Sequence, residues 1–302
     1  MNKTIFALGF FDGVHIGHAA LLKACREMAE EFGCRCGAVT FGTHPNALVQ
    51  NRMPVLINAP RDREMLLRER FFMDTVLTLP FDEQMRTMPW EAFLEMLCRE
   101  HGAAGFVCGD DFRFGYRGRG NALLLGDWCR SHELPCAVVP EQTLDGIRVS
   151  SSYIRSQIED GDMATAVKFL GHPHILRGTV VHGKALGRKL GVPTANLQLI
   201  PGMAVPRFGV YACRCIIDGV GYPAVTNVGT RPTVEGQSVT VEPWILDYSG
   251  DLYGREITLE FYRFLRPEEK FPNLEALKAQ IHEDAAQTRT YLAERSQNDP
   301  CF

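Results

Sequence analysis

The sequence predicts two domains of different class, an N-terminal Rossmann-like parallel α/β domain and an antiparallel β-barrel with a C-terminal helix. Short apolar runs alternate with segments of helical periodicity from Ile5 to Val139. After Gly171-His172-Pro173-His174 the periodicity changes from helical to alternating. A last segment, from Asn273 to about Glu294, is again helical. We therefore expect domains at residues 1–170 and 175–302.

The chain opens with an apolar strand and an amphipathic helix that are joined by a glycine-rich turn. Ile5 to Leu8 is the strand, and the helix carries Leu21, Cys25, Met28 and Phe32 at the spacing of one face. Between strand and helix, free backbone N–H groups and the positive end of the helix dipole point at one spot, which is an anion site. The turn reads Gly9-Phe10-Phe11-Asp12-Gly13-Val14-His15-Ile16-Gly17-His18.

Two histidines in this turn carry the functional prediction. His15 and His18 are three residues apart, so on the first helical turn they lie side by side and can both donate to one phosphate. The glycines of the turn allow the backbone to come close. A glycine turn with polar capping residues begins many parallel α/β domains, so the turn without the histidines would indicate little.

Four further strands and three helices complete the predicted α/β domain. The alternation of strands and helices along the chain predicts a parallel sheet of five strands. The further strands are Cys36–Phe41, Thr75–Leu79, Ala104–Cys108 and Cys136–Val139, and the helices are Pro60–Phe72, Pro89–His101 and Leu123–His132.

Three segments that follow strands are candidate ligand contacts. His44 lies in a polar turn after the second strand, although a turn residue before a proline is an equally good interpretation. The loop Gly109–Gly120, which contains Asp111, is rich in Gly, Arg and aromatic residues and can wrap phosphates or stack on a ring; a solvated loop is the alternative. Ser151 and Arg155 can grip a leaving pyrophosphate, whereas helix capping is the default role of such a serine.

The second half has the alternating pattern of an antiparallel barrel. Asp218-Gly219 and Ser249-Gly250-Asp251 are turn signals, and the C-terminal helix is expected to pack on the barrel through a stripe that begins at Leu274. The strand candidates are Leu176–Val181, Gly209–Ile217, Tyr222–Val228, Val239–Tyr248 and Arg255–Leu265.

A pair of oxygen-bearing side chains in the second half predicts a metal site. Thr194 and Asn196 lie two apart, so on an extended segment both face the same way and can offer oxygens to one hard cation. Strand alternation alone often produces such a pair, but here it follows several glycines and Pro193. The nearby Gly178–Ala185 nearly matches the Walker A pattern, yet Ala185 replaces the hydroxyl residue that would hold Mg²⁺, so we reject a Walker A site.

Composition and charge exclude several classes of protein. The formal net charge of −4 and the pI near 6.2 argue against a general nucleic-acid binder. No apolar run has the length of a signal peptide or membrane span, so we expect a cytoplasmic protein without membrane contact. The ten cysteines form no Cys-x-x-Cys pair, which argues against zinc and a disulfide framework.

Two resemblances rest on these motifs. His15-Ile16-Gly17-His18 resembles the HIGH signature of the nucleotidylyltransferase and class I aminoacyl-tRNA synthetase superfamily, which implies ATP binding and adenylyl transfer. Nearly the whole chain resembles the prokaryotic bifunctional riboflavin kinase/FMN adenylyltransferase family, also called FAD synthetase. The matching motifs include Thr40–Pro45, Val149–Arg155, Gly187–Asn196, Asn227–Thr233, Val241-Glu242 and Arg266–Phe271.

The family resemblance implies roles for individual residues. His15 and His18 would hold the phosphates of ATP while FMN attacks the α-phosphorus, with Ser151 and Arg155 near the leaving group. Thr194 and Asn196 would bind Mg²⁺–ATP, and Glu242 would be the base for the riboflavin 5′-hydroxyl, so the implied catalytic residues are Glu242, His15, His18 and Asn196. Further contacts to nucleotide or flavin are implied for Gly9, Phe11, Asp12, Gly13, Gly17, His44, Asp111, Gly187, Arg188 and Arg266.

Three functions fit the sequence. The leading one is an enzyme that makes FMN from riboflavin and then FAD from FMN, with ATP as co-substrate and Mg²⁺ as metal. The second is a member of the same family with one active domain, and the third is a flavin-binding regulator without catalysis. The expected partners are riboflavin, FMN and ATP, and the expected state is a monomer or weak homo-oligomer.

Overall fold

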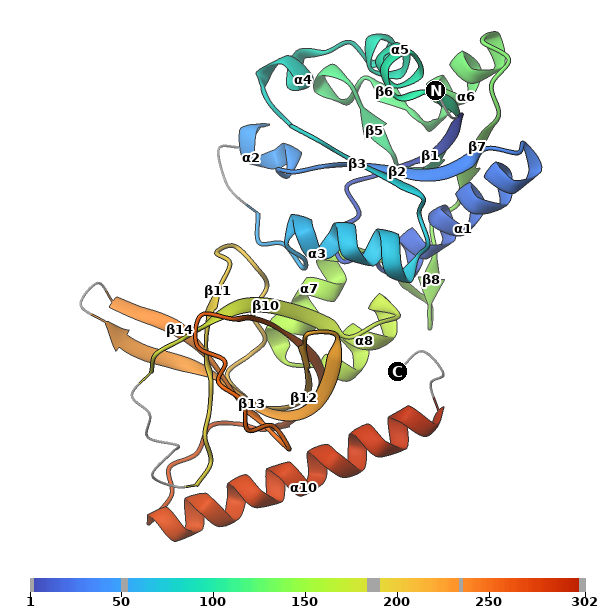
Figure 1. Cartoon of the computed structure of the whole chain (residues 1–302). Coiled ribbons are helices and arrows are strands. Elements are labelled where there is room, and N and C mark those ends of the chain that lie inside the picture. The colour runs from blue at the N-terminus through green and yellow to red at the C-terminus, as the bar shows by residue number, and fades with distance from the viewer. Residues whose placement is uncertain (1–2, 50–53, 184–190, 234–235, 299–302) are drawn as a thin grey trace. The chain divides into compact units, whose positions relative to one another are not determined.

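The computed structural model describes residues 3–49, 54–183, 191–233 and 236–298 (Figure 1). The chain forms two compact units, Met1–Ser151 and Ser152–Phe302. The first is a parallel α/β unit and the second contains a closed barrel, so the predicted fold class is confirmed.

Five parallel strands form the sheet of the first unit, in the spatial order β3-β2-β1-β4-β7. The chain therefore starts in the middle of the sheet, extends to one edge and then returns to the other side of β1. At this reversal the carboxyl ends of β1 and β4 lie side by side, which is where open α/β sheets bind ligands. The strands are β1 (Thr4–Leu8), β2 (Arg35–Phe41), β3 (Thr75–Leu79), β4 (Ala103–Gly109) and β7 (Cys136–Val139).

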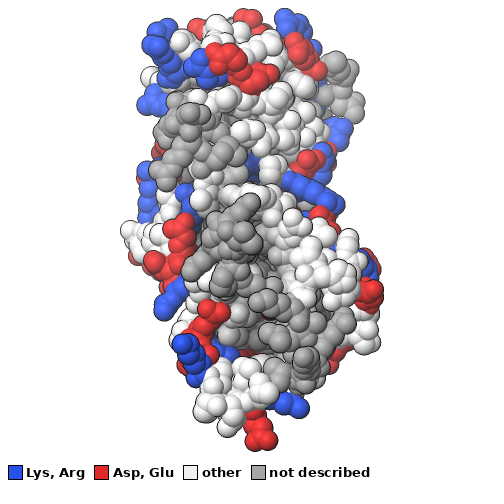
Figure 2. Space-filling model, turned by 90° about the vertical axis from the view of Figure 1, so that its left-hand side faces the viewer, with Lys and Arg blue, Asp and Glu red and all other residues white. Residues whose placement is uncertain are grey.

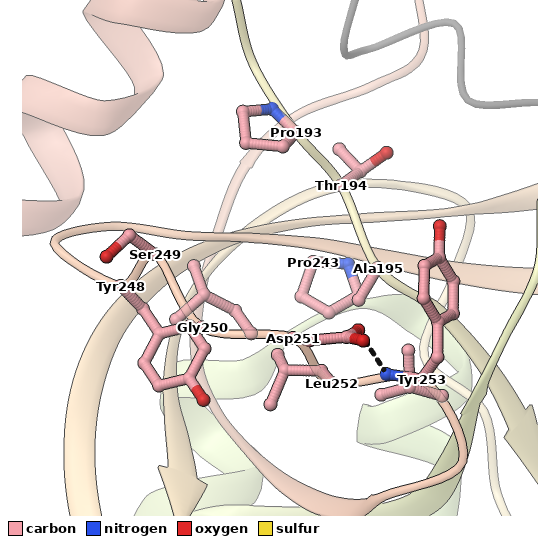
Figure 3. A pocket seen from close by; sticks show the side chains of 12 residues that line it. Pro193, Thr194, Ala195, Pro243, Tyr248, Ser249, Gly250, Asp251, Leu252 and Tyr253 are labelled. Carbon is pink, nitrogen blue, oxygen red and sulfur yellow. Dashed lines mark hydrogen bonds between the residues drawn. The ribbon is translucent and has the colours of Figure 1, made fainter.

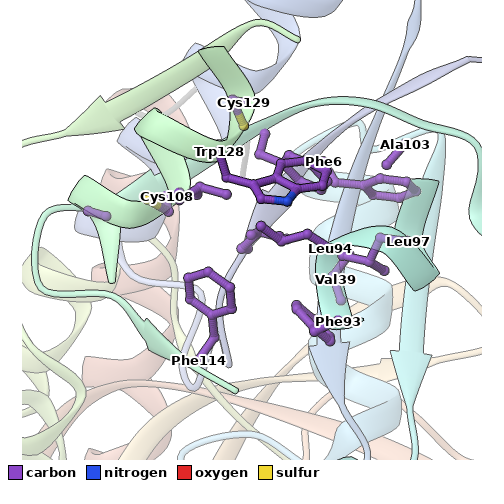
Figure 4. Packing of buried hydrophobic residues seen from close by; sticks show 14 residues of the cluster. Phe6, Val39, Phe93, Leu94, Leu97, Ala103, Cys108, Phe114, Trp128 and Cys129 are labelled. Carbon is purple, nitrogen blue, oxygen red and sulfur yellow. The ribbon is translucent and has the colours of Figure 1, made fainter. Parts of the chain in front are cut away.

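Helices and short hairpins surround this sheet. Figure 4 shows the core on the face covered by α5 and α6, where Phe6 and Val39 of the sheet pack with Leu94, Leu97 and Trp128. The helices are α1 (Ile16–Glu31), α2 (Pro45–Val49), α3 (Pro60–Met65), α4 (Glu83–Thr87), α5 (Trp90–His101) and α6 (Ala122–Ser131), and the hairpins are β5 (Arg113–Phe114) with β6 (Gly120–Asn121) and β8 (Thr143–Leu144) with β9 (Ile147–Arg148).

Two details of these helices differ from prediction. The buried face of α1 is formed by Leu22, Cys25 and Ala29, because small alanine packs closely against the sheet, whereas Phe32 is the C-cap residue and is 53% exposed. The predicted helix Pro60–Phe72 is shorter, because α3 passes into a π-helical turn at Leu66–Arg70. The wider turn leaves the adjacent Leu66 and Leu67 both buried.

Six antiparallel strands close the barrel of the second unit in the order β10-β11-β14-β13-β12-β15. One strand, β11, was not among the predicted strands, because its four residues are too few to show a period. The strands are β10 (His174–Val181), β11 (Asn196–Leu199), β12 (Gly209–Ile217), β13 (Val220–Thr233), β14 (Gly236–Ile245) and β15 (Glu256–Arg266).

Three helices accompany the barrel. α7 (Ser151–Asp160) and α8 (Met163–Leu170) precede it, and α8 contacts β10 and β15. α10 (Leu274–Asn298) contacts β12 and β13 through a stripe that includes Ala285 and Leu292. Leu274 is 66% exposed, so the buried stripe begins later than the sequence predicts. Where the two expected activities divide along the chain stays a prediction.

His174 at the start of β10 is a buried histidine held in its neutral form. Its side chain is fully buried, and its Nε2–H donates to the Ala204 carbonyl oxygen at 2.9 Å. Burial lowers the pKa of His174 from 6.5 to about 4. The folded state therefore takes up this proton at lower pH than the unfolded state does, and stability is lost as the pH falls between these two values.

We expect the free energy of unfolding to fall by roughly 3 kcal/mol between about pH 7 and pH 4 through His174 alone. The variant His174→Gln keeps an amide donor that does not titrate, so its unfolding free energy should depend less on pH. Urea unfolding of both proteins across this pH range measures the difference. Parallel curves for the two proteins would contradict the assignment.

The surface carries charges of both signs. On the face shown in Figure 2, Lys and Arg are interspersed with Asp and Glu. None of the helices in the described part of the chain combines the length and apolar character needed to cross a membrane.

Candidate active sites

The turn after β1 has an unusual backbone. Phe11 and Val14 have positive φ angles of 59° and 38°, and both side chains are fully buried. Such strain is retained where the surrounding structure fixes it, and it gathers at functional sites. Gly13 has a φ of 81°, so the glycine that the sequence places there is needed for the backbone path.

Asp12 ties this turn to two other segments. Its Oδ1 accepts hydrogen bonds from the backbone N–H groups of Ile57, at 2.8 Å, and Asn58, at 3.3 Å. Its carbonyl oxygen accepts a hydrogen bond of 2.9 Å from the Ser151 hydroxyl. These bonds hold the turn, the segment before α3 and Ser151 together, so Asp12 and Ser151 position the site.

His15 and His18 lie side by side, as their spacing predicts. Their rings are stacked with centroids 3.6 Å apart, and His15 Nδ1 accepts from the His18 backbone N–H at 3.3 Å. His15 therefore carries its proton on Nε2. A Cβ at Gly17 would lie 3.2 Å from the His15 ring, so only glycine leaves the pair its full space.

His18 is neutral but sits in a positive environment. The pKa of His18 is well below its usual value, chiefly through burial and further through the charges of His15 and Arg63. The rings stand at the N-terminus of the 16-residue helix α1, whose dipole favours an anion. The neutral imidazole of His18 and the Nε2–H of His15 can both donate to a phosphate.

An aromatic cavity of about 750 Å³ opens beside this turn. It brings Gly9 of the turn together with Asp111 of the loop after β4. His44 contacts the Phe10 ring of this cavity at 4.4 Å between centroids. A flat heteroaromatic ring fits such a lining. The aromatic residues that line it are Phe10, Phe41, Phe81, Phe93, Phe112 and Phe114.

A second cavity, of about 510 Å³, lies in the barrel unit (Figure 3). Thr194 and Ala195 line one side, and the segment Tyr248–Tyr253 lines another. Asp251 Oδ1 accepts from the Tyr253 N–H at 3.1 Å, which fixes this segment in a turn. Pro243 of β14 also lines this cavity.

Thr194 and Asn196 both lie at the beginning of β11. Thr194 forms a β-bridge with Trp244, and Asn196 is the first residue of the strand. Asn196 Oδ1 is buried and has no hydrogen-bond partner among the described residues. A buried oxygen of this kind suits a hard cation such as Mg²⁺. A Cβ at Gly183 would lie 2.2 Å from the Asn196 side chain, so glycine there leaves room for the amide.

Glu242 lies on β14 in a half-buried position, outside the cavity that Pro243 and Ile245 line. In the antiparallel register it stands opposite Asn227 of β13. Asn227 Nδ2 donates to Glu268 Oε1 at 3.1 Å, so a second carboxylate shares this neighbourhood. Trp244, two residues on, packs edge-on against His282 of α10 with centroids 5.7 Å apart.

Several predicted site residues are not placed by the structure at either cavity or at the histidine pair. Arg266 makes a bidentate ion pair with buried Asp284, at 2.8–3.1 Å, which ties β15 to α10. Gly187 and Arg188 lie outside the described residues. Arg155 belongs to α7 in the second unit, and its role near a leaving group stays a prediction.

Sequence reasoning missed several buried polar residues of the first unit, among them Asn58 and Arg63. Both side chains are fully buried. The segment around Arg63 reads as a charged surface helix with four arginines, Arg61, Arg63, Arg68 and Arg70, and nothing in the sequence distinguishes the buried one.

Comparison with known proteins decides the family. A family model described as FAD synthetase matches residues 1–153, and one described as riboflavin kinase matches residues 170–292. The chain belongs to the bifunctional riboflavin kinase/FMN adenylyltransferase family. Members from Listeria monocytogenes and Escherichia coli K12 are 32% and 36% identical to it, over 97% and 95% of this chain and 93% and 92% of theirs.

A solved structure has the same fold over nearly the whole chain. It is a crystal structure of a protein from Streptococcus pneumoniae that is named a macrolide-efflux protein, with 30% identity and a TM-score of 0.86. The match covers 95% of this chain and 94% of that chain. The two units of this chain therefore occur together in another protein of known structure.

Proposed function

We propose that this chain makes FAD from riboflavin in two ATP-dependent steps. The 5′-hydroxyl of riboflavin attacks the γ-phosphorus of ATP and gives FMN and ADP. The phosphate of FMN then attacks the α-phosphorus of a second ATP and gives FAD and pyrophosphate. The observation that carries this proposal is the match of both family models along one chain, FAD synthetase at residues 1–153 and riboflavin kinase at residues 170–292.

The first unit is assigned to adenylyl transfer. The stacked His15 and His18 donate N–H groups to the phosphates of ATP, and the dipole of α1 adds to the stabilisation of charge as pyrophosphate leaves. The flavin ring of FMN fits the aromatic cavity that begins at Gly9 and Phe10. No base is needed, because the attacking phosphate is already largely ionised at neutral pH.

The second unit is assigned to phosphorylation. Glu242 accepts the proton of the riboflavin 5′-hydroxyl as that oxygen attacks. Thr194 and Asn196 would hold Mg²⁺, a role supported by the buried, unpartnered Oδ1 of Asn196. Mg²⁺ bound with ATP supplies neutralisation of charge on the phosphates.

Incubation of the purified chain with riboflavin, ATP and Mg²⁺, followed by chromatography of the flavins, tests this function. We expect FMN to appear first and FAD later. FMN without FAD would mean that only the kinase is active, and binding of flavin without either product would mean a regulator. Both outcomes contradict the proposal.

The compact second unit provides a test of how the activities divide. A shortened protein of residues 152–302 keeps α8, which contacts β10 and β15, and should therefore fold. We expect it to phosphorylate riboflavin at a rate within a few-fold of the full chain and to form no FAD from FMN. FAD formation by this folded piece would overturn the assignment.

The partners of the protein, its cellular location and its oligomeric state are also part of the proposal. Both steps use small molecules, namely riboflavin, FMN and ATP, and we place them in the cytoplasm without nucleic acid. The negative net charge and the mixed charges in Figure 2 support this choice of partners. We expect a monomer or a weak homo-oligomer.

A further inference from the structure

Arg63 is a fully buried cation whose hydrogen-bonding capacity is only partly used. Its Nη2 donates to the carbonyl oxygen of Phe41, at the end of β2. Its Nε and Nη1 are buried and have no hydrogen-bond partner among the described residues. Burial lowers the pKa of Arg63 to about 10, so the side chain remains charged at neutral pH. A buried charge of this kind is costly unless something pairs with it.

A second buried side chain near the same turn is also unpaired. Asn58 is fully buried, and neither Oδ1 nor Nδ2 has a partner among the described residues. Its backbone N–H donates to Asp12 Oδ1, which places Asn58 against the turn after β1. The Nδ1 of His18, in the same turn, is likewise buried without a partner. Native proteins rarely leave so many buried polar atoms unsatisfied in one neighbourhood.

Arg63 has neighbours both in the aromatic cavity and in the turn after β1. The guanidinium carbon lies 4.2 Å from the centroid of the Phe10 ring, and Phe10 and Phe41 both line the aromatic cavity. The charge of Arg63 also acts on His18 and on Asp12. Arg63 therefore stands where the aromatic cavity meets the phosphate-binding turn.

We propose that Arg63 and Asn58 are phosphate-binding residues of the first site, which donate to phosphate oxygens of the bound nucleotide through Nε, Nη1 and Nδ2. This inference rests on the proposed adenylyl transfer. A phosphate supplies the negative charge and the acceptor oxygens that these groups lack, and guanidinium is well suited to bind two of its oxygens at once.

The test compares Arg63→Met, Arg63→Lys and Asn58→Ala with the control Arg61→Met in the full chain. Arg61 lies two residues away on α3 and is exposed. We expect Arg63→Met to lower kcat/KM for FAD formation from FMN by about 100-fold or more, Arg63→Lys to retain part of it, and Asn58→Ala to lose about 10-fold. FAD formation by Arg61→Met should stay within about two-fold of the unaltered protein. Riboflavin phosphorylation should stay within the same range in every variant.

A binding measurement separates this role from a structural one. Inorganic pyrophosphate, a product of the proposed reaction, should raise the Tm of the unaltered protein and of Arg61→Met. That rise should be absent in Arg63→Met and reduced in Arg63→Lys. Separate KM values for FMN and ATP show which of the two supplies the phosphate.

Two outcomes would overturn the inference. One is a full pyrophosphate-dependent rise in Tm for Arg63→Met, which would mean that the arginine only supports the fold or holds buried water. The other is FAD formation by folded Arg63→Met within about three-fold of the unaltered protein. If the unaltered protein makes no FAD from FMN, the proposed function fails, and the pyrophosphate measurement still decides whether Arg63 binds phosphate.

Discussion

Replacement of both His15 and His18 by alanine is expected to lower FAD formation from FMN by at least about 10³-fold. Removal of a single donor that stabilises a developing negative charge typically costs a factor of about 10² to 10³, and this variant removes two. The stacked rings and the shared position at the start of α1 mean that both imidazoles act on the same group. Initial rates of FAD formation at saturating ATP measure the effect.

The control for this variant lies in the same unit. His101 ends α5, next to the start of β4 at the amino edge of the sheet, which is opposite the edge that carries the site. His101→Ala should retain FAD formation within about two-fold. Riboflavin phosphorylation should persist in the double variant, and an equal loss of both activities in a folded protein would refute the separation of the sites.

Glu242→Gln is expected to lower riboflavin phosphorylation by a factor of about 10² to 10⁴, which is the usual contribution of a general base. Glutamine keeps the shape of the side chain but cannot accept the proton of the 5′-hydroxyl. Binding of riboflavin and ATP should change far less, so the loss should appear in kcat rather than in KM. Adenylylation of supplied FMN should be unaffected.

Two further glutamates show whether this effect is specific. Glu256 of β15 is exposed and pairs with the largely buried Arg177 at 3.2 Å, and Glu256→Gln should retain full kinase activity. Glu268 is held by Asn227, the register partner of Glu242, and is the other carboxylate in this neighbourhood. If Glu242→Gln keeps activity within a few-fold while Glu268→Gln loses it, Glu268 is the base and our assignment is wrong.

Features that depend on short spacings could be predicted from the sequence. The five strands of the parallel sheet are predicted from local apolar runs, and the side-by-side position of His15 and His18 follows from their separation of three residues on a helix. The barrel was predicted from alternation in its longer strands. In each case the signal lies within a few consecutive residues.

Features that depend on distant contacts could not be predicted. Asn227 and Glu268 are 41 positions apart, and no local pattern indicates that they meet. Whether Arg61 or Arg63 is buried is decided by Phe10 and Phe41, which belong to other elements. The missed strand β11 is only four residues long and is defined by its partners. These contacts between distant residues are therefore known only from the tertiary structure.

A mixing experiment tests the central claim, that two independent sites in one chain act in succession. The His15/His18 double variant and Glu242→Gln are each incubated with riboflavin, ATP and Mg²⁺, alone and together, and FAD is measured by chromatography. Our account predicts that the double variant alone stops at FMN, that Glu242→Gln alone forms little of either product, and that the mixture forms FAD. A mixture that forms no more FAD than the separate variants would contradict it.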